Sequence, residues 1–324
     1  MEENTEQRVD LTLFSEKIQE LKDRIASVIV GQEQTVDLVL TAILANGHVL
    51  IEGVPGVAKT LLARLTARLI DADFSRVQFT PDLMPSDVLG TTVFNMKTNG
   101  FDFHQGPIFA DIVLVDEINS APAKTQAALF EVMEERQISI DGTTHRMGDL
   151  YTILATQNPV EQEGTYKLPE AQLDRFLMKI TMDYPSLEEE VNILERHHTN
   201  AALVKLDDIT PAITKEELLS LRAFMNQVFV DRTLLQYIAL IVQQTRTSKA
   251  VYLGASPRAS VAMLQSSKAY ALLQGRDFVT PEDIKFVAPY VLQHRLILTA
   301  EAEMEGYSPV KVTQRLIDKV EVPK

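Results

Sequence analysis

A glycine-containing loop constrains the fold of this chain more than any other feature of its sequence. The apolar run His48–Ile51 has the length of a buried strand, and Thr60–Leu69 repeats its leucines at helical spacing. The loop between them includes Gly53, Val54, Pro55, Gly56, Val57, Ala58, Lys59 and Thr60. It fits the phosphate-binding loop pattern at every defined position except Ala58, where glycine is usual. Strand, loop and helix in this order predict the start of a βαβ unit.

The residue types in this loop suit a bound phosphate. Glycines let backbone amides curl around the β-phosphate, and the helix that follows offers its positive N-terminal end. Lys59 adds a point charge, and Thr60 adds a hydroxyl for Mg²⁺. Ala58 adds one methyl group, which is tolerable if that residue has helical dihedral angles. A glycine-containing turn before an ordinary helix is the alternative, but the flanking strand and helix favour a nucleotide site.

Three more apolar runs predict further strands, at Val77–Thr80, Ile112–Val115 and Tyr151–Thr156. The helical pattern Thr125–Arg136 lies between the last two. Such alternation predicts an α/β fold in which a parallel sheet carries helices on both faces.

Two carboxylates, Asp116 and Glu117, directly follow the strand Ile112–Val115. Ligands of a doubly wound sheet bind at the C-terminal edge of its strands, where these side chains would lie. We expect Asp116 to hold the Mg²⁺ shell, and Glu117 to polarise a water for in-line attack on the γ-phosphate. A solvated acidic turn after a core strand is the alternative interpretation.

Three polar residues further along the chain complete this set. Asn158 follows the strand Tyr151–Thr156 and is predicted to orient the attacking water, although an Asn-Pro turn competes with this interpretation. Arg175 lies between an aspartate and a phenylalanine, so by itself it indicates a local ion pair beside an apolar anchor. Arg258 follows Ser256 and Pro257, which predict a helix start. A cation there opposes the helix dipole, so either a nucleotide phosphate meets it or it is a surface arginine.

Two segments interrupt the alternation, and their turn dipeptides predict β-hairpins at Thr92–Phe103 and Gln137–Arg146. The first contains Asn99-Gly100, and the second contains Asp141-Gly142. The first also carries four large apolar side chains, Phe94, Met96, Phe101 and Phe103. These side chains predict a contact patch for polypeptide, unless they pack the hairpin onto its own core.

From residue 214 onward the pattern is helical and predicts an all-α second domain. The helical runs begin at Thr214, Asp231, Ser256 and Thr280. The charge changes near the same place: residues 1–200 carry 16 basic and 32 acidic side chains, whereas residues 201–324 carry 15 and 13. We therefore predict a nucleotide-binding α/β domain over residues 1–200 and a smaller α-helical domain over residues 201–324.

The composition argues against several functional classes of protein. The net charge of −14 argues against a surface that holds a phosphate backbone, so nucleic acid is not expected as a partner. Without cysteine there is no disulfide framework and no thiolate zinc site, which fits a reducing compartment. The chain opens without an apolar signal segment, and no run approaches the ~18 apolar residues of a spanning helix. We expect a cytoplasmic protein without membrane insertion.

Taken together, these segments resemble the AAA+ ATPases. That class combines Walker A, Walker B, sensor 1, an arginine finger and sensor 2 in this order. The corresponding residues here are Gly53–Thr60, Asp116 with Glu117, Asn158, Arg175 and Arg258. Within the class, the amino-acid sequence from about Ile29 to Leu298 is similar to that of the MoxR subfamily. The most similar segments are Val30–Gln32, Gln78–Leu83, Gly106–Ala110, Asp116–Asn119 and Leu168–Phe176.

The resemblance implies a P-loop core followed by an α-helical lid. It also implies that Val30, Gly31 and Gln32 line the adenine pocket, and that the loop residues through Leu61 contact the nucleotide. Arg175 would reach the γ-phosphate of an adjacent subunit.

Two features limit what can be carried over from the family. The resemblance leaves two alternatives for sensor 2 of this branch, the nucleotide of its own subunit or that of a neighbour, so the site that Arg258 serves is open. Ser120 and Ala123 stand where the family has an arginine and a second proline. A contact assigned to that arginine therefore cannot be transferred.

By the same resemblance the chain would use ATP and Mg²⁺ in a homo-oligomeric ring, expected to be a hexamer. It would act as a chaperone-like remodeller or activator of protein complexes, with a von Willebrand factor A-domain protein as its expected partner. A scaffold that binds ATP without turnover is an alternative, disfavoured by Glu117, Asn158 and Arg175. A nucleic-acid motor is another, disfavoured because Lys97 and Arg146 are the only Lys or Arg residues in the two hairpins.

Overall fold

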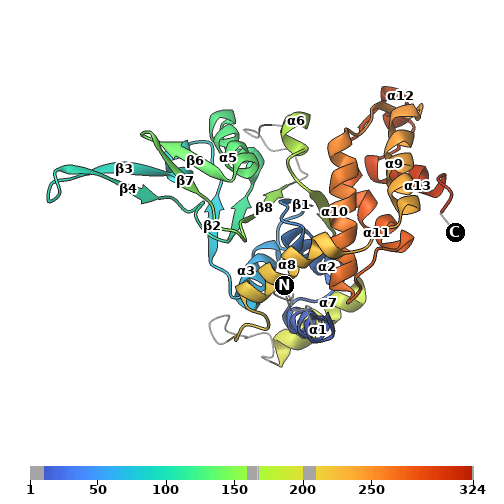
Figure 1. The fold of residues 1–324 in the computed structure, drawn as a ribbon, viewed down its shortest axis with the longest axis horizontal. Helices are drawn as coiled ribbons and strands as arrows, with labels where there is room; N and C mark the ends of the chain where they lie inside the picture. Colours follow the sequence, from blue (N-terminus) through green and yellow to red (C-terminus); the bar gives the residue numbers. More distant parts are fainter. Residues whose placement is uncertain (1–10, 159–165, 167, 200–208, 323–324) are drawn as a thin grey trace, which may run out of the picture.

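The computed structural model of the protein describes residues 11–158, 166, 168–199 and 209–322. The opening residues 1–10 and the predicted domain boundary at residue 200 lie outside them. The centre of the molecule is a five-stranded parallel sheet in the order β2-β5-β8-β1-β9 (Figure 1). Its strands are β1 Val49–Gly53, β2 Phe74–Gln78, β5 Ile112–Asp116, β8 Thr152–Gln157 and β9 Met178–Met182.

The predicted parallel sheet is confirmed, with two differences at its edges. β2 begins at Phe74 rather than at Val77, and β9 was not predicted. Both strands lie at an edge of the sheet, where partly exposed polar residues such as Arg76 and Lys179 interrupt the apolar pattern.

Helices cover both faces of the sheet, as predicted. Because successive side chains of a strand point to opposite faces, Val49 and Ile51 enter one apolar core, and Leu50 enters the other. The first core is covered by α1 Leu11–Val28, α2 Glu33–Leu44 and α3 Lys59–Leu69. The second is covered by α4 Pro85–Leu89 and α5 Ala123–Glu135.

Both predicted hairpins form, but their turns differ. The strands are β3 Gly90–Asn95 with β4 Gly100–Gln105, and β6 Gln137–Ile140 with β7 Thr143–Arg146. Asp141 and Gly142 make a two-residue turn in which both φ angles are positive, at 50° and 79°. In the first hairpin residues 96–99 form a longer loop, and Gly100 already belongs to β4. The dipeptide Asn99-Gly100 therefore marks the end of a loop rather than the whole turn.

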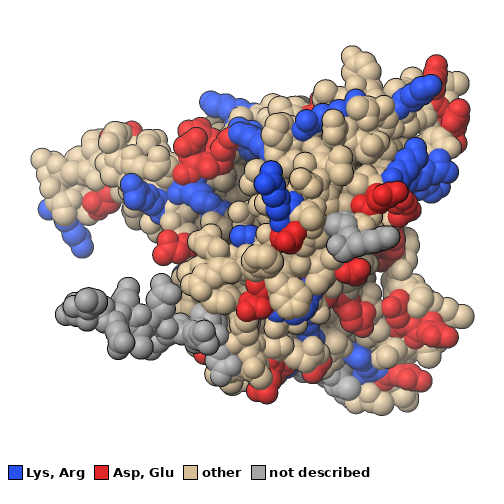
Figure 2. Space-filling model, turned by 45° about the vertical axis from the view of Figure 1, so that its right-hand side comes forward, with Lys and Arg blue, Asp and Glu red and all other residues tan. Residues whose placement is uncertain are grey.

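The β3–β4 hairpin projects away from the body of the molecule (Figure 1). Large apolar side chains are exposed near its tip: Phe94 and Phe101 contact each other at 5.3 Å between ring centroids, and Met96 is 89% exposed. Figure 2 shows that this projection carries few charged side chains. At its base, Phe103 instead packs against the second core. The tip therefore offers free apolar surface, whereas Phe103 anchors the hairpin.

The C-terminal part of the chain is mainly helical. Its helices are α8 Lys215–Phe224, α9 Arg232–Thr247, α10 Pro257–Leu273, α11 Pro281–Leu292, α12 Ala300–Met304 and α13 Pro309–Asp318. The helical domain predicted here also contains one short antiparallel pair, β10 Val251–Leu253 with β11 Ile297–Leu298. Both strands are too short to show a period in sequence. Along the chain, α6 Glu170–Leu173 lies between β8 and β9, and α7 Leu187–His198 follows β9. None of the described helices is long and apolar enough to span a bilayer.

A buried histidine joins the sheet to α5. The His48 ring accepts the backbone N–H of Ile153 at Nδ1 (3.0 Å), so its proton lies on Nε2, which donates to the Met133 carbonyl at 3.1 Å. Burial, together with the nearby charge of Arg136, lowers the pKa of His48 to about 3. The histidine is therefore a neutral connector in the folded protein.

Because of His48, the folded protein is expected to lose stability in mild acid. Between pH 6.5 and about 3 the unfolded chain takes up a proton at His48 that the folded protein refuses, so the free energy of unfolding falls as the pH falls. At pH 5 the contribution of His48 lowers the free energy of unfolding by ~2 kcal/mol. Urea unfolding at pH 7.5 and pH 5 measures it. Between the two pH values, the free energy of unfolding of the His48→Asn variant should fall by ~2 kcal/mol less than that of the wild type. Buried His294, whose pKa is also lowered, contributes to the pH dependence of both proteins. Equal losses in both proteins would contradict this prediction.

Candidate nucleotide site

The loop that joins β1 to α3 has the backbone that a phosphate cradle requires. A Cβ on Gly53 would lie 2.8 Å from the Met182 carbonyl oxygen, so glycine allows β9 to approach closely. Gly56 has a φ of +90°, and a Cβ there would meet no atom within 4 Å. The Lys59 ammonium donates to the Gly53 carbonyl at 2.6 Å and thereby closes the loop. The space over Gly56 is thus open, and the Lys59 cation belongs to the same loop.

Ala58 does not meet the condition under which its methyl group would be tolerated without strain. Its dihedral angles, φ 63° and ψ 22°, are left-handed rather than helical. Ala58 is the residue directly before α3. An L residue in this conformation costs about 1–2 kcal/mol, which explains why glycine is usual here.

A cavity of about 270 Å³ adjoins the loop, close to the lower end of the ~300–1,000 Å³ of small-molecule sites. Its lining residues are Val28, Ile29, Val30, Gln32, Gly56, Val57, Ala58, Leu61, Pro185, Ile193 and His197. The predicted adenine-side residues Val30 and Gln32 therefore share one cavity with the loop. Between them Gly31 has a φ of +74°, and a Cβ there would collide with the Glu189 carboxylate.

The wall formed by Pro185, Ile193 and His197 was not predicted. Ile193 and His197 belong to α7, far from the loop in sequence. No local sequence pattern indicates the place of His197 beside the cavity.

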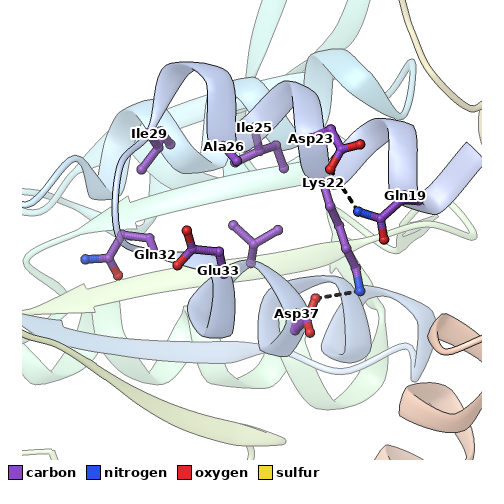
Figure 3. A pocket seen from close by; sticks show the side chains of 10 residues that line it. Gln19, Lys22, Asp23, Ile25, Ala26, Ile29, Gln32, Glu33 and Asp37 are labelled. Atoms are coloured by element: carbon purple, nitrogen blue, oxygen red, sulfur yellow. Dashed lines mark hydrogen bonds and ion pairs between the residues drawn. The ribbon is translucent and has the colours of Figure 1, made fainter. Parts of the chain in front are cut away.

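A second hollow, of about 260 Å³, lies between α1 and α2 (Figure 3). It shares Ile29 and Gln32 with the first but contains none of the loop residues. Its only cation, Lys22, is already paired with Asp37 at 2.7 Å. It therefore lacks the groups that would bind a phosphate.

The two predicted carboxylates lie at the C-terminal edge of the sheet. Asp116 is buried at the end of β5, and Glu117 after it is exposed, with a left-handed φ of 56°. Burial lowers the pKa of Lys59, and the charges of Asp116 and Glu117 oppose that shift. Both carboxylates therefore lie close enough to Lys59 to act on its charge. Thr60 is in the first turn of α3, and Asn158 directly follows β8, the neighbour of β5.

Arg76 was missed by the sequence analysis. Its Nε donates to Oδ2 of Asp116 at 2.6 Å, and its guanidinium also donates to Gln78 at 3.3 Å. These residues lie on the edge strand β2, beside β5. Only the pairing of the two strands brings this cation to Asp116.

The two predicted arginines meet at one carboxylate. Arg175 donates from Nε to Oε2 of Glu134 at 2.8 Å, and Arg258 donates from Nη2 to Oε1 at 3.0 Å. Arg175 first, and Arg258 to a smaller degree, lower the pKa of Glu134. Asp174 pairs instead with Arg295 at 2.6 Å, so the local ion pair considered for Arg175 does not form. Glu134 was not predicted, because its partners are distant in sequence.

Arg258 lies where the sequence places it. Ser256 precedes α10, Pro257 begins it, and Arg258 is in the first turn with a side chain that is 64% exposed. The anion that it meets within this subunit is Glu134.

Comparison with known proteins agrees with this geometry. The profile of the ATPase family associated with various cellular activities (AAA) matches residues 48–178, and that of the AAA lid domain matches residues 243–318. The protein named Chaperone MoxR1 of Mycobacterium tuberculosis is 44% identical, over 93% of this chain and 81% of its own length. Protein MoxR of Methylorubrum extorquens is 30% identical, over 91% of each chain.

The chain belongs to the MoxR family of AAA+ ATPases. Another relative, YeaC of Bacillus subtilis, is 47% identical over 93% of both chains. The crystal structure of a candidate ATPase from Cytophaga hutchinsonii superposes with a TM-score of 0.89 at 40% identity, covering 97% of each chain. An AAA core with a helical lid is thus the fold of this family member.

Proposed function

We propose that this MoxR-type protein binds and hydrolyses Mg²⁺-ATP and uses the cycle to remodel or activate protein complexes. The observation that carries the proposal is the convergence of the glycine loop, its cavity and two carboxylates at one edge of the sheet. Phosphate release from Mg²⁺-ATP by the assembled wild-type protein tests it. A protein that bound ATP but released no phosphate would instead be a nucleotide-dependent scaffold.

The residues divide the work by position. Residues 53–61 and 30–32 hold the nucleotide, and Thr60 and Asp116 hold Mg²⁺, which supplies charge neutralisation when it is bound. Glu117 acts as the base for the attacking water, and Asn158 orients that water. The open space at Gly56 and the position of Lys59 beside it fit a polyphosphate.

We further propose that both arginines act on the nucleotide of a neighbouring subunit in a ring, taken to be a hexamer. Arg175 and Arg258 bind the two oxygens of one carboxylate, Glu134, which places them side by side. Two cations held together suit one phosphate group better than two separate sites. This favours action of Arg258 in trans. The division into residues 1–200 and 201–324 is part of the same proposal, because Arg258 then belongs to the lid and can report its motion.

The partner is proposed to be a protein, engaged in the cytoplasm through the tip of the β3–β4 hairpin. A von Willebrand factor A-domain protein is the first candidate, and nucleic acid is not expected. The exposed side chains of Phe94, Met96 and Phe101 support a protein contact, since apolar groups on a projecting hairpin suit a polypeptide.

Shortening this tip is expected to separate capture from hydrolysis. Replacing Met96–Gly100 with a short Gly-Ser turn should abolish capture of a von Willebrand factor A-domain bait and leave the ATPase rate within about twofold, because the tip lies away from the nucleotide loop. Parallel pull-down and phosphate-release assays measure both. Met96→Ser and Met304→Ser form a matched pair, because each side chain is 89% exposed and only the first lies on the hairpin. Unchanged capture by the shortened protein would move the partner site elsewhere.

A further inference from the structure

One buried hydroxyl connects the two carboxylate residues of the site. Thr156, on β8, is 2% exposed and lies beside the end of β5. Its Oγ1 accepts the backbone N–H of Glu117 at 3.0 Å and donates to Oδ1 of Asp116 at 3.1 Å. The directions of both hydrogen bonds are fixed, because an amide N–H can only donate. The hydroxyl proton is therefore left for the carboxylate.

Glu117 depends on this contact. Its backbone is left-handed, a conformation that costs ~1–3 kcal/mol in a residue other than glycine and persists only where its surroundings hold it. The parallel pairing of β5 with β8 ends at Val115, so the N–H of Glu117 lies beyond the end of that ladder. The bond to Thr156 satisfies this N–H and fixes the direction in which Glu117 leaves the strand.

Asp116 is held from two sides. Thr156 donates to Oδ1, and Arg76 donates to Oδ2 at 2.6 Å. The plane of this buried carboxylate is therefore set before any ligand arrives. A metal ligand whose orientation is fixed by a hydrogen-bonded neighbour binds more tightly, and loss of such a neighbour typically lowers metal affinity or activity by ~10–100-fold.

We propose that Thr156 is a positioning residue that sets Asp116 and Glu117 together, so that the metal-side carboxylate and the base keep a fixed relation. The proposal rests on the proposed ATPase function. Thr156 does not touch the reacting atoms; it acts through the two residues that it binds.

The competing explanation is that Thr156 only packs the strand. Valine has nearly the same shape and suits a strand as well, so the Thr156→Val variant removes the hydroxyl and little else. Thr156→Ser keeps the hydroxyl and removes a methyl group. Thr152→Val is the matched control, because Thr152 is buried on the same strand with its hydroxyl 3.3 Å from the Leu150 carbonyl.

The four proteins are compared by kcat and KM for ATP, and by the Mg²⁺ concentration that gives half-maximal binding of a fluorescent ATP analogue. We expect Thr156→Val to lower kcat by ~10–100-fold and to raise the Mg²⁺ midpoint, with KM for ATP within about twofold. Thr156→Ser should recover most of both effects, and Thr152→Val should match the wild type. Urea unfolding confirms that each variant is folded.

The outcomes distinguish failure of the positioning role of Thr156 from failure of the proposed hydrolytic site. Wild-type kcat and Mg²⁺ midpoint in Thr156→Val, with Glu117→Gln inactive, would overturn the positioning role alone. Equal defects in Thr156→Val and Thr152→Val would also overturn it, because a general loss of packing would then explain both. Wild-type turnover in Glu117→Gln would overturn the proposed hydrolytic site itself.

Discussion

The Glu117→Gln protein is expected to bind ATP as tightly as the wild type and to lose its turnover, whereas Lys59→Ala should lose the nucleotide itself. Glu117 acts only on the attacking water, so its loss should lower kcat by ~10²–10⁴-fold without weakening ATP binding. Lys59 lies at the phosphate loop, 2.6 Å from the Gly53 carbonyl, and supplies the positive charge there. The two defects should therefore separate into a binding loss and a rate loss.

Binding of a fluorescent ATP analogue and phosphate release, measured on the same preparations, distinguish the two variants. Glu131→Gln is the matched control, because Glu131 is an exposed glutamate on α5 and the change removes the same charge. It should behave as the wild type. Hydrolysis at the wild-type rate by Glu117→Gln would refute its assignment as the base, and unchanged ATP affinity in Lys59→Ala would refute the assignment of the loop.

The central strands of the sheet were predictable from sequence because they are buried on both faces. All five residues of β5 are buried, and its apolar run stands out without any partner being known. β2 and β9 lie at the edges and carry exposed Arg76 and partly buried Lys179, so their apolar pattern is broken. The central strands could therefore be predicted, whereas the start of β2 was misplaced and β9 was missed.

The site residues likewise fall into those that could be predicted from the sequence and those that could not. The nucleotide loop and the carboxylates after β5 depend on spacing within one segment, and that spacing is visible in the sequence. The partners of these residues come from other segments: Arg76 lies 40 residues from Asp116, and Glu134 lies 124 residues from Arg258. Such pairs follow from strand order and domain packing, which a single sequence does not reveal. The left-handed backbone of Ala58 was likewise hidden, because alanine rarely adopts it.

The Arg175→Ala protein should be nearly inactive although its own nucleotide loop is intact. Within one subunit, Arg175 is bound to Glu134 through Nε and Nη2, at 2.8 and 2.7 Å, and lies 5.8 Å from the centre of the Phe130 ring. These contacts hold the guanidinium in a fixed orientation at the surface, ready to exchange a carboxylate for a phosphate. An arginine finger contributes ~10³–10⁵ in rate, so turnover should fall by that factor with ATP affinity unchanged. Arg175→Lys should not restore it, since lysine lacks the planar fork.

Mixing subunits tests whether Arg175 acts across an interface. Arg175→Ala subunits supply an intact nucleotide loop, and Lys59→Ala subunits supply an intact arginine. In randomly mixed rings roughly one interface in four combines the two, so activity should return to about that fraction of the wild type. The matched control mixes Arg175→Ala subunits with the Lys59→Ala, Arg175→Ala double variant, whose rings contain no finger and should stay inactive. Mixed rings, identified by two different affinity tags, that showed no recovery would place Arg175 in its own subunit's site. The pairing with Glu134 would then be its working position rather than the state that it leaves when the ring closes.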